Sequence, residues 1–254
     1  MLTESERSFF LENGYLHVRG VLDREHLARL QGEFDRVWEL EKPPVSRGKL
    51  LKHRAFIDLI EHPPILERHR ALFGDQTQLL QYDLLRQGPH SKFKSRYWHR
   101  DFVFPGDRPL AANTILYFDD MTEERGPTLV VPRSHLGTEL PPRSSLADSL
   151  PGEVAVYADA GDAVFINGAI WHSGGQNRSD SVRRAAYLYY GYWWIKRYDE
   201  HDPWPAEALL NANTRRLELL GVKMPDWDQH MYGQLRRDEV WAQLDRAGPP
   251  QGSG

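Results

Sequence analysis

Helical spacing of apolar residues dominates the first 75 positions of the chain. The clearest run begins behind Asp23, a residue type that caps helix N-termini, and predicts a long amphipathic helix. Its apolar positions are Leu27, Leu30, Phe34, Val37 and Trp38. Before it, Thr3-Glu4-Ser5-Glu6 has the form of a capping box that opens a shorter helix, and Asn13-Gly14 ends that helix. The residues from Tyr15 to Arg19 alternate loosely and predict a first strand.

The segment after the long helix is interrupted by helix-breaking residues. Glu41 to Lys52 contains Pro43-Pro44 and is expected to form a loop over the surface or the pocket. Phe56 to His62 and Ile65 to Phe73 predict two short helices, which Pro63-Pro64 separates. These helices are expected to wrap a core and not to carry chemistry.

From Thr77 onward the pattern changes to the alternation and the short apolar runs of strands. The predicted strands are residues 78–85, 113–118, 128–131, 154–157, 163–166 and 184–196. The segment from Gly137 to Gly152 is rich in proline and serine, and we expect it to leave the sheet as a long excursion that could act as a lid. Ala206 to Leu220 predicts a further helix.

Strands at near-regular spacing, with helices gathered at both ends, predict a mainly β fold with flanking helices. The fold class that fits is a double-stranded β-helix, or jelly roll, of the cupin-like kind. We expect one domain over residues 1–254, with a helical N-terminal wrapping at about 1–75, a β core at about 77–196 and a C-terminal helical segment at about 204–245. No internal repeat or second domain is visible in the sequence.

Composition and charge narrow the possible partners of this 254-residue chain. A formal net charge of −4 argues against nucleic acid or an anionic membrane as a partner, because both require a basic face. No apolar run approaches the ~20 residues of a membrane span, and the first residues lack the pattern of a secretory signal, so we expect a cytoplasmic protein. Cysteine is absent, which excludes disulfides, a thiol nucleophile and thiolate metal sites. The oligomeric state is left open.

One stretch, Arg96 to Phe102, places an imidazole and a carboxylate two residues apart between aromatic residues. Of the eleven histidines, only His99 is followed two places later by a carboxylate, that of Asp101. Residues i and i+2 of a strand point to the same face, so both side chains can reach one ion. Two histidines and one carboxylate hold non-haem Fe(II) and leave coordination positions open, although Mn, Ni, Co and Zn accept the same ligands. Taken alone, such a pair is more often chance or a surface ion pair.

His172 is a candidate for the second histidine of such a site. It follows the apolar run Val164 to Ile166, and distant strands of a jelly roll lie face to face, so it could meet His99 and Asp101. The alternative for His172 is a capping or turn histidine beside Gly174-Gly175. That alternative is the better reading when His172 is considered alone.

Two consecutive arginines, Arg183 and Arg184, begin the last predicted strand. Neighbouring residues of a strand face opposite ways, so one guanidinium points into the barrel and the other points out. A buried guanidinium is costly unless it binds an anion, and a dicarboxylate with its other end on the metal would supply one. The alternative is a pair of surface arginines on an edge strand.

His99-Arg100-Asp101, then His172, then an arginine eleven residues later together resemble the phytanoyl-CoA dioxygenase family of Fe(II)- and 2-oxoglutarate-dependent oxygenases. The stretch from Gln81 to Phe102 is similar to that of ectoine hydroxylases. Further similar segments are Asn13-Gly14-Tyr15, Arg19 to Leu22, Gly126 to His135 and His172 to Asn177, so the resemblance covers most of residues 9–195. Arg133, Leu85 and Gly174 depart from the family pattern and put ectoine itself in doubt as the substrate.

The resemblance implies an Fe(II)- and 2-oxoglutarate-dependent dioxygenase that consumes O2, releases succinate and CO2, and oxidises an unactivated C–H bond of a small-molecule metabolite, most often by hydroxylation. It implies His99, Asp101 and His172 as metal ligands and as the catalytic set. By family spacing it implies Arg183 as the inward arginine that binds 2-oxoglutarate. The presence of Asp101 disfavours the halogenating variants of the family, which lack that carboxylate.

Seven further residues are candidates, each with a structural alternative. Gln81, Asn113 and Thr128 could contact the co-substrate, or could serve as strand and turn residues. The aromatic residues Trp98, Phe102, Phe104 and Trp193 could form walls of the substrate site, although buried aromatics are most often core. Two other functions remain open from the residues alone: a non-catalytic jelly-roll module that binds a small ligand, and a cupin-like metal-dependent isomerase or hydrolase.

Overall fold

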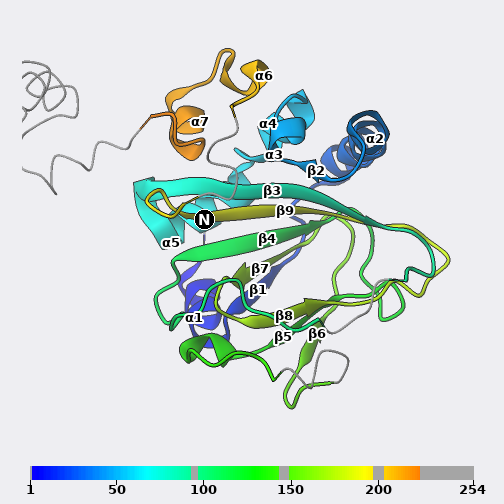
Figure 1. The fold of residues 1–254 in the computed structure, drawn as a ribbon, viewed down its shortest axis with the longest axis vertical. Helices are drawn as coiled ribbons and strands as arrows, with labels where there is room; N and C mark the ends of the chain where they lie inside the picture. The colour runs from blue at the N-terminus through cyan, green and yellow to red at the C-terminus, as the bar shows by residue number, and fades with distance from the viewer. Residues whose placement is uncertain (1, 93–96, 143–148, 197–202, 224–254) are drawn as a thin grey trace, which may run out of the picture.

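The computed structural model describes residues 2–92, 97–142, 149–196 and 203–223 (Figure 1). Its helices are α1 (Glu4–Asn13), α2 (Arg24–Glu41), α3 (Arg47–Leu50), α4 (Arg54–Leu59), α5 (Pro63–Phe73), α6 (Ala206–Leu209) and α7 (Thr214–Leu219), with 3₁₀ turns η1 (Gly74–Gln76) and η2 (Ser134–Leu136). Its strands are β1 (Tyr15–Val18), β2 (Val45–Ser46), β3 (Thr77–Gln87), β4 (Ala111–Tyr117), β5 (Thr128–Val131), β6 (Val154–Val156), β7 (Ala163–Asn167), β8 (Trp171–Gly174) and β9 (Arg183–Tyr192).

The strands form two antiparallel sheets that face one another. The larger sheet has the order β1-β7-β4-β9-β3-β2, and the smaller has the order β6-β5-β8. Figure 1 shows the smaller sheet lying across one face of the larger, while α2, α3 and α4 lie over the opposite face. From β6 to β9 the chain alternates between the two sheets, as in a jelly roll. The prediction of a mainly β jelly roll with flanking helices is therefore confirmed.

Two cores follow from the alternation of side chains along the central strands. On β9, Ala186, Leu188 and Tyr190 face the helices, whereas Ala185 faces the smaller sheet. The core between the sheets contains Ile115, Tyr117, Met121, Val130, Val156, Ala158, Val164, Ile166, Ile170 and Ala185. A period of two thus gives each central strand one face for the helices and one for the space between the sheets.

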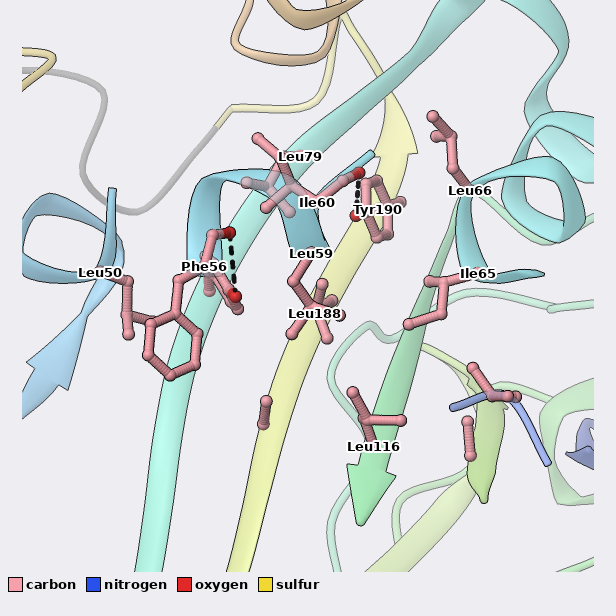
Figure 2. Packing of buried hydrophobic residues seen from close by; sticks show 14 of the residues in the cluster. Leu50, Phe56, Leu59, Ile60, Ile65, Leu66, Leu79, Leu116, Leu188 and Tyr190 are labelled. Atoms are coloured by element: carbon pink, nitrogen blue, oxygen red, sulfur yellow. Dashed lines mark hydrogen bonds between the residues drawn. The ribbon is translucent and has the colours of Figure 1, made fainter. Parts of the chain in front are cut away.

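The helical layer is joined to the large sheet by apolar packing and by hydrogen bonds from tyrosines. Figure 2 shows Leu188 and Tyr190 of β9 packed with Leu59 and Ile60 of the α4 region. The hydroxyl of Tyr190 donates to the carbonyl of Ile60 over 2.9 Å. A second bond from Tyr82 to the carbonyl of Phe56 ties β3 to α4. Each tyrosine fills core volume and still satisfies its hydroxyl, which keeps α4 in one position on the sheet.

The helix ends follow the capping signals of the sequence. Thr3 and Glu6 form the predicted capping box of α1, and Gly14 adopts the left-handed conformation that ends it. The side chain of Asp23 accepts from the His26 N–H at the start of α2. Pro63-Pro64 lies where α5 begins after α4, in the first turn of the helix, where a missing N–H costs nothing.

Two local predictions are wrong, and one strand was not predicted. Residues 41–52 are not a loop, because they contain the end of α2, the short strand β2 and helix α3. The helix expected over Ala206 to Leu220 is divided into α6 and α7 by Asn211, which has a φ of 54°. The segment after β7 returns as strand β8, so His172 lies inside a strand.

Some predictions concern residues outside those described. These are part of the Gly137–Gly152 excursion and the C-terminal helical segment beyond residue 223. Among the residues that the structure does describe, we find no helix with the length and apolarity needed to cross a bilayer.

Candidate metal centre and anion site

Two histidines and an aspartate from distant parts of the chain converge beside β8. His99 forms an isolated antiparallel bridge with His172, in which each backbone N–H donates to the other carbonyl over 3.1 and 2.9 Å. Oδ1 of Asp101 lies 3.8 Å from Nε2 of each histidine. The three donor atoms lie within 4.8 Å of one another, and among the described residues no other group of three histidine or acidic side chains comes this close.

The tautomer of each histidine is set by its own backbone. Nδ1 of His99 lies 3.0 Å from the carbonyl of Tyr97, and Nδ1 of His172 lies 3.0 Å from the carbonyl of Ile170. A carbonyl only accepts, so each Nδ1 carries the proton and each Nε2 presents a lone pair toward Asp101. This arrangement, with one ring nitrogen held by the protein and the other free, is the usual one for a histidine that binds a metal.

The donor set fits one divalent ion. Metal–nitrogen bonds of about 2.1 Å put facial donors roughly 3 Å apart, so side-chain rotations must close separations that are 3.8 Å to Asp101 and at most 4.8 Å overall. Burial lowers the pKa of His172, partly offset by Asp101, so this ring is held in the neutral form that metals require. The His99 side chain is 43% exposed and the His172 side chain 10%, which leaves the His99 side accessible to small molecules.

A cavity of about 350 Å³ adjoins the three donors and ends at a buried arginine. Arg183 is 1% exposed, and its Nε donates to Sδ of Met121 over 3.3 Å. Within the described residues, neither Nη1 nor Nη2 of Arg183 has a hydrogen-bond partner. A buried guanidinium with both terminal nitrogens unsatisfied is an anion site, because the cation is costly there without a counter-charge.

The hydroxyl of Tyr117 lies close enough to this guanidinium for the two groups to interact. Tyr117 donates to, or accepts from, the hydroxyl of Thr128. Burial raises the pKa of Tyr117, while the neighbouring charge of Arg183 opposes that rise. The adjacent Arg184 faces the other way and pairs with Asp119 and Asp35, both at 2.8 Å. The two arginines therefore differ in their counter-charges. Arg184 forms ion pairs with two aspartates of the protein, whereas both terminal nitrogens of Arg183 are left for an anionic ligand.

The weaker candidates of the sequence fall into two groups. Gln81, Asn113, Thr128 and Phe102 line the cavity, and Oδ1 of Asn113 is buried without a hydrogen-bond partner among the described residues.

The remaining aromatic candidates are not among the described residues that line the cavity. Trp98 is buried in a separate apolar cluster with Leu129 and Leu150, because it faces away from the side on which His99 lies. Phe104 packs against Phe102, with ring centroids 5.5 Å apart. Trp193 follows the end of β9, beyond the rows of residues that face the cavity. A role for these three residues in substrate binding therefore stays a prediction, without support from the lining of the cavity.

Several lining residues were missed by the sequence analysis. Tyr187 and Tyr189 lie on β9 at even spacing from Arg183, so the same period of two that orients the arginine could have identified them. Asp83 faces the cavity from β3 and accepts from Nε2 of Gln81. Tyr117 is not among the described residues that line the cavity, but it interacts with Arg183; it had no local signal, because that interaction depends on the neighbouring strand.

Comparison with known proteins identifies related chains. The family model for phytanoyl-CoA dioxygenase (PhyH) matches residues 10–185. The dioxygenase trt7 of Aspergillus terreus is 32% identical over 206 residues, which cover 68% of this chain and 68% of that protein. The dioxygenase af480 of Aspergillus fumigatus is 25% identical over 209 residues, covering 74% of this chain and 66% of that one. The chain thus spans about two thirds of the length of these fungal relatives.

Solved structures share the fold. SnoK, a non-haem α-ketoglutarate-dependent carbocyclase from nogalamycin biosynthesis, is 26% identical, with a TM-score of 0.65 over 79% of this chain and 89% of its own. HygX from Streptomyces hygroscopicus, with nickel and 2-oxoglutarate bound, is 20% identical, with a TM-score of 0.67 over 78% of this chain and 89% of its own. The likeness to HygX concerns the fold alone.

Proposed function

This chain belongs to the phytanoyl-CoA dioxygenase family, and we propose that it is a non-haem Fe(II)- and 2-oxoglutarate-dependent oxygenase whose iron is held by His99, Asp101 and His172. It oxidises a C–H bond of a small-molecule substrate, most often by hydroxylation, while 2-oxoglutarate leaves as succinate and CO2. The observation that carries the proposal is the combination of a three-donor site and a buried, unsatisfied Arg183 in one cavity.

The iron bound at this site supplies the O2 chemistry that side chains lack. The protein's own residues provide binding and orientation. Backbone carbonyls accept from Nδ1 of both histidines and so direct Nε2 toward the metal, and Asp101 contributes a negative charge beside them. A 2+ ion with one carboxylate keeps a net positive charge, which favours a bidentate anionic co-substrate.

Arg183 holds the far carboxylate of 2-oxoglutarate. Its two terminal nitrogens offer the forked geometry that matches a carboxylate, and the hydroxyl pair of Tyr117 and Thr128 can add one further donor. Gln81 and Asn113 are proposed to contact the co-substrate or the substrate nearer the metal. Because Arg183 is fully buried, little water competes for these bonds, and they are correspondingly strong.

The substrate enters the remaining part of the cavity. Ile115, Ile166 and Phe102 give it apolar walls, while Gln81 and Asp83 give it polar groups, so the site suits a small molecule with both kinds of surface. SnoK acts as a carbocyclase, and a ring-forming outcome on this chain would need the same residues to hold a different substrate carbon near the metal. We also propose the cytoplasm as the compartment, where metabolism supplies 2-oxoglutarate.

Succinate formation from 2-oxoglutarate tests the proposal. The full-length protein with Fe(II), ascorbate and O2 should form succinate slowly even without the true substrate, and omission of Fe(II) should stop it. A non-catalytic binding module would form no succinate. An isomerase or hydrolase would bind the metal but be indifferent to O2 and 2-oxoglutarate, so no succinate above the metal-free control would contradict the assignment.

A further inference from the structure

The residues next to the metal-ligand candidates in sequence, Arg100 and Trp171, are fixed by hydrogen bonds to the backbone. Arg100 stands between His99 and Asp101, and Trp171 directly precedes His172. Adjacent residues of an extended chain face opposite ways, so these two side chains point away from the donors.

The guanidinium of Arg100 is 7% exposed and donates to four backbone carbonyls. Nε donates to Phe102 over 2.8 Å, and Nη2 donates to Phe104 over 2.8 Å and to Gly137 over 2.9 Å. Nη1 donates to the carbonyl of Glu139 over 2.9 Å. One side chain therefore joins the ligand segment to two stretches of backbone, one of which lies 37 to 39 residues further along the chain.

Trp171 reaches the same acceptor. Its Nε1 donates to the carbonyl of Glu139 over 2.9 Å, and its backbone N–H donates to Oγ of Ser134 over 2.8 Å. A single carbonyl oxygen thus receives one bond from the segment that carries His99 and Asp101 and another from the strand that carries His172.

Of the three metal-ligand candidates, Asp101 depends most on the hydrogen bonds of Arg100 for the direction of its side chain. The backbone bridge already fixes the two histidines relative to each other. Asp101 lies in a bend after that bridge, held by its N–H to the carbonyl of Gly168 over 2.9 Å. The direction of its carboxylate depends on the bend, and Arg100 holds the far side of the bend through Phe102 and Phe104.

We propose that Arg100 and Trp171 are positioning residues that, through the carbonyl of Glu139, preset Asp101 and His172 for the metal. This inference rests on the proposed function and adds to it residues that touch neither metal nor substrate. Partners of metal ligands typically contribute 10–100-fold to metal affinity, and we expect an effect of that size here. Because Phe102 lines the cavity, the same contacts also hold part of the wall of the substrate site.

Metal affinity of conservative variants tests the inference. Arg100→Lys keeps the charge but cannot reach four carbonyls, and Trp171→Phe keeps the ring but loses the N–H. Each should raise the Kd for Mn(II), measured by titration of the full chain under anaerobic conditions, by about 10–100-fold. The Mn(II) electron paramagnetic resonance spectrum should also change, because the geometry of the ligands is altered. A merely structural role would leave that spectrum unchanged.

An arginine and a tryptophan that do not contact the metal-ligand segments serve as matched controls. Arg125, a partly exposed arginine that donates to the carbonyl of Asp120, and the half-exposed Trp194 provide Arg125→Lys and Trp194→Phe, which should leave the Kd unchanged. Because both positioning residues act on one acceptor, the double variant Arg100→Lys/Trp171→Phe should raise the Kd by less than the product of the single effects.

The outcomes separate the two proposals. No Mn(II) binding by the unaltered protein would contradict the metal site itself. Normal binding by the unaltered protein, with Kd values of both single variants within threefold of it, would overturn the positioning role alone. If Arg100→Lys does not fold, Trp171→Phe decides the matter, since it removes one hydrogen bond and little volume.

Discussion

Replacement of Arg183 by methionine should increase the stability of the free protein while abolishing its response to 2-oxoglutarate. Arg183 is buried, and both terminal nitrogens lack a partner within the described structure. An unpaired buried ion costs several kcal/mol even after relaxation, so exchange for an apolar side chain of similar length removes a cost from the free enzyme. Most substitutions of a fully buried residue have the opposite sign.

The loss of binding can be derived from the same contacts. Hydrogen bonds to charged groups contribute about 1.5–3 kcal/mol each, so two such bonds to the far carboxylate amount to roughly 3–6 kcal/mol. At about 1.4 kcal/mol for each factor of ten, Arg183→Met should raise the Kd for 2-oxoglutarate by roughly 10² to 10⁴.

Arg184→Met is the matched control on the opposite face of the same strand. Arg184 pairs with Asp119 and Asp35, and its loss leaves the buried Asp119 without that counter-charge. This variant should unfold at lower urea than the parent yet keep its response to 2-oxoglutarate. Arg183→Met should show the reverse pattern.

Urea unfolding with Mn(II), with and without 2-oxoglutarate, measures both effects in one experiment. A ligand at 100 times its Kd stabilises the folded state by about 2.7 kcal/mol, a shift that should be seen for the parent and Arg184→Met only. If Arg183→Met retained the shift and Arg184→Met lost it, the assignment of the two faces of β9 would be refuted.

Three other outcomes follow from the structure. His172→Ala should abolish both Mn(II) binding and Fe(II)-dependent succinate formation, and retained metal binding would place the site elsewhere. Burial lowers the pKa of His69 to about 3, so between about pH 6.5 and 3 the unfolded chain binds a proton that the folded chain does not. The free energy of unfolding should therefore fall as the pH falls through that window, by up to about 5 kcal/mol; His69→Gln should flatten this dependence in urea unfolding, and an unchanged slope would contradict the reasoning. Arg133 has a φ of 68° and an exposed ion pair with Glu12, so Arg133→Gly should be neutral or stabilising by up to about 1 kcal/mol in thermal unfolding; a clear destabilisation would show that the ion pair outweighs the left-handed backbone.

The elements that the sequence predicted best are those with local causes. The cap at Asp23 and the capping box at Thr3 act within one helical turn, and the central strands carry long apolar runs. Strand β8 was missed because its four residues pair with β5, 40 to 46 positions earlier, and have little apolar pattern of their own. Strand β2 and helix α3 were missed because Pro43-Pro44 favours a loop when only neighbours are considered.

The features of the site also separate into those with local causes, which the sequence predicts, and those that depend on contacts between distant segments. The ligand types, the i and i+2 spacing of His99 and Asp101, and the alternation of Arg183 and Arg184 are local and could be read from the residues. The distance between His99 and His172 depends on the bridge between remote segments, which no local pattern contains. Trp98 was assigned to the cavity on its aromatic character, although its position next to His99 already indicates the opposite face.

Anomalous diffraction from crystals grown without O2 in Mn(II) and 2-oxoglutarate tests the central claim most directly. The account predicts one strong peak about 2.1 Å from Nε2 of His99, Nε2 of His172 and a carboxylate oxygen of Asp101, with a carboxylate of 2-oxoglutarate on Arg183. A peak bound by other residues, or a 2-oxoglutarate carboxylate away from Arg183, would contradict it.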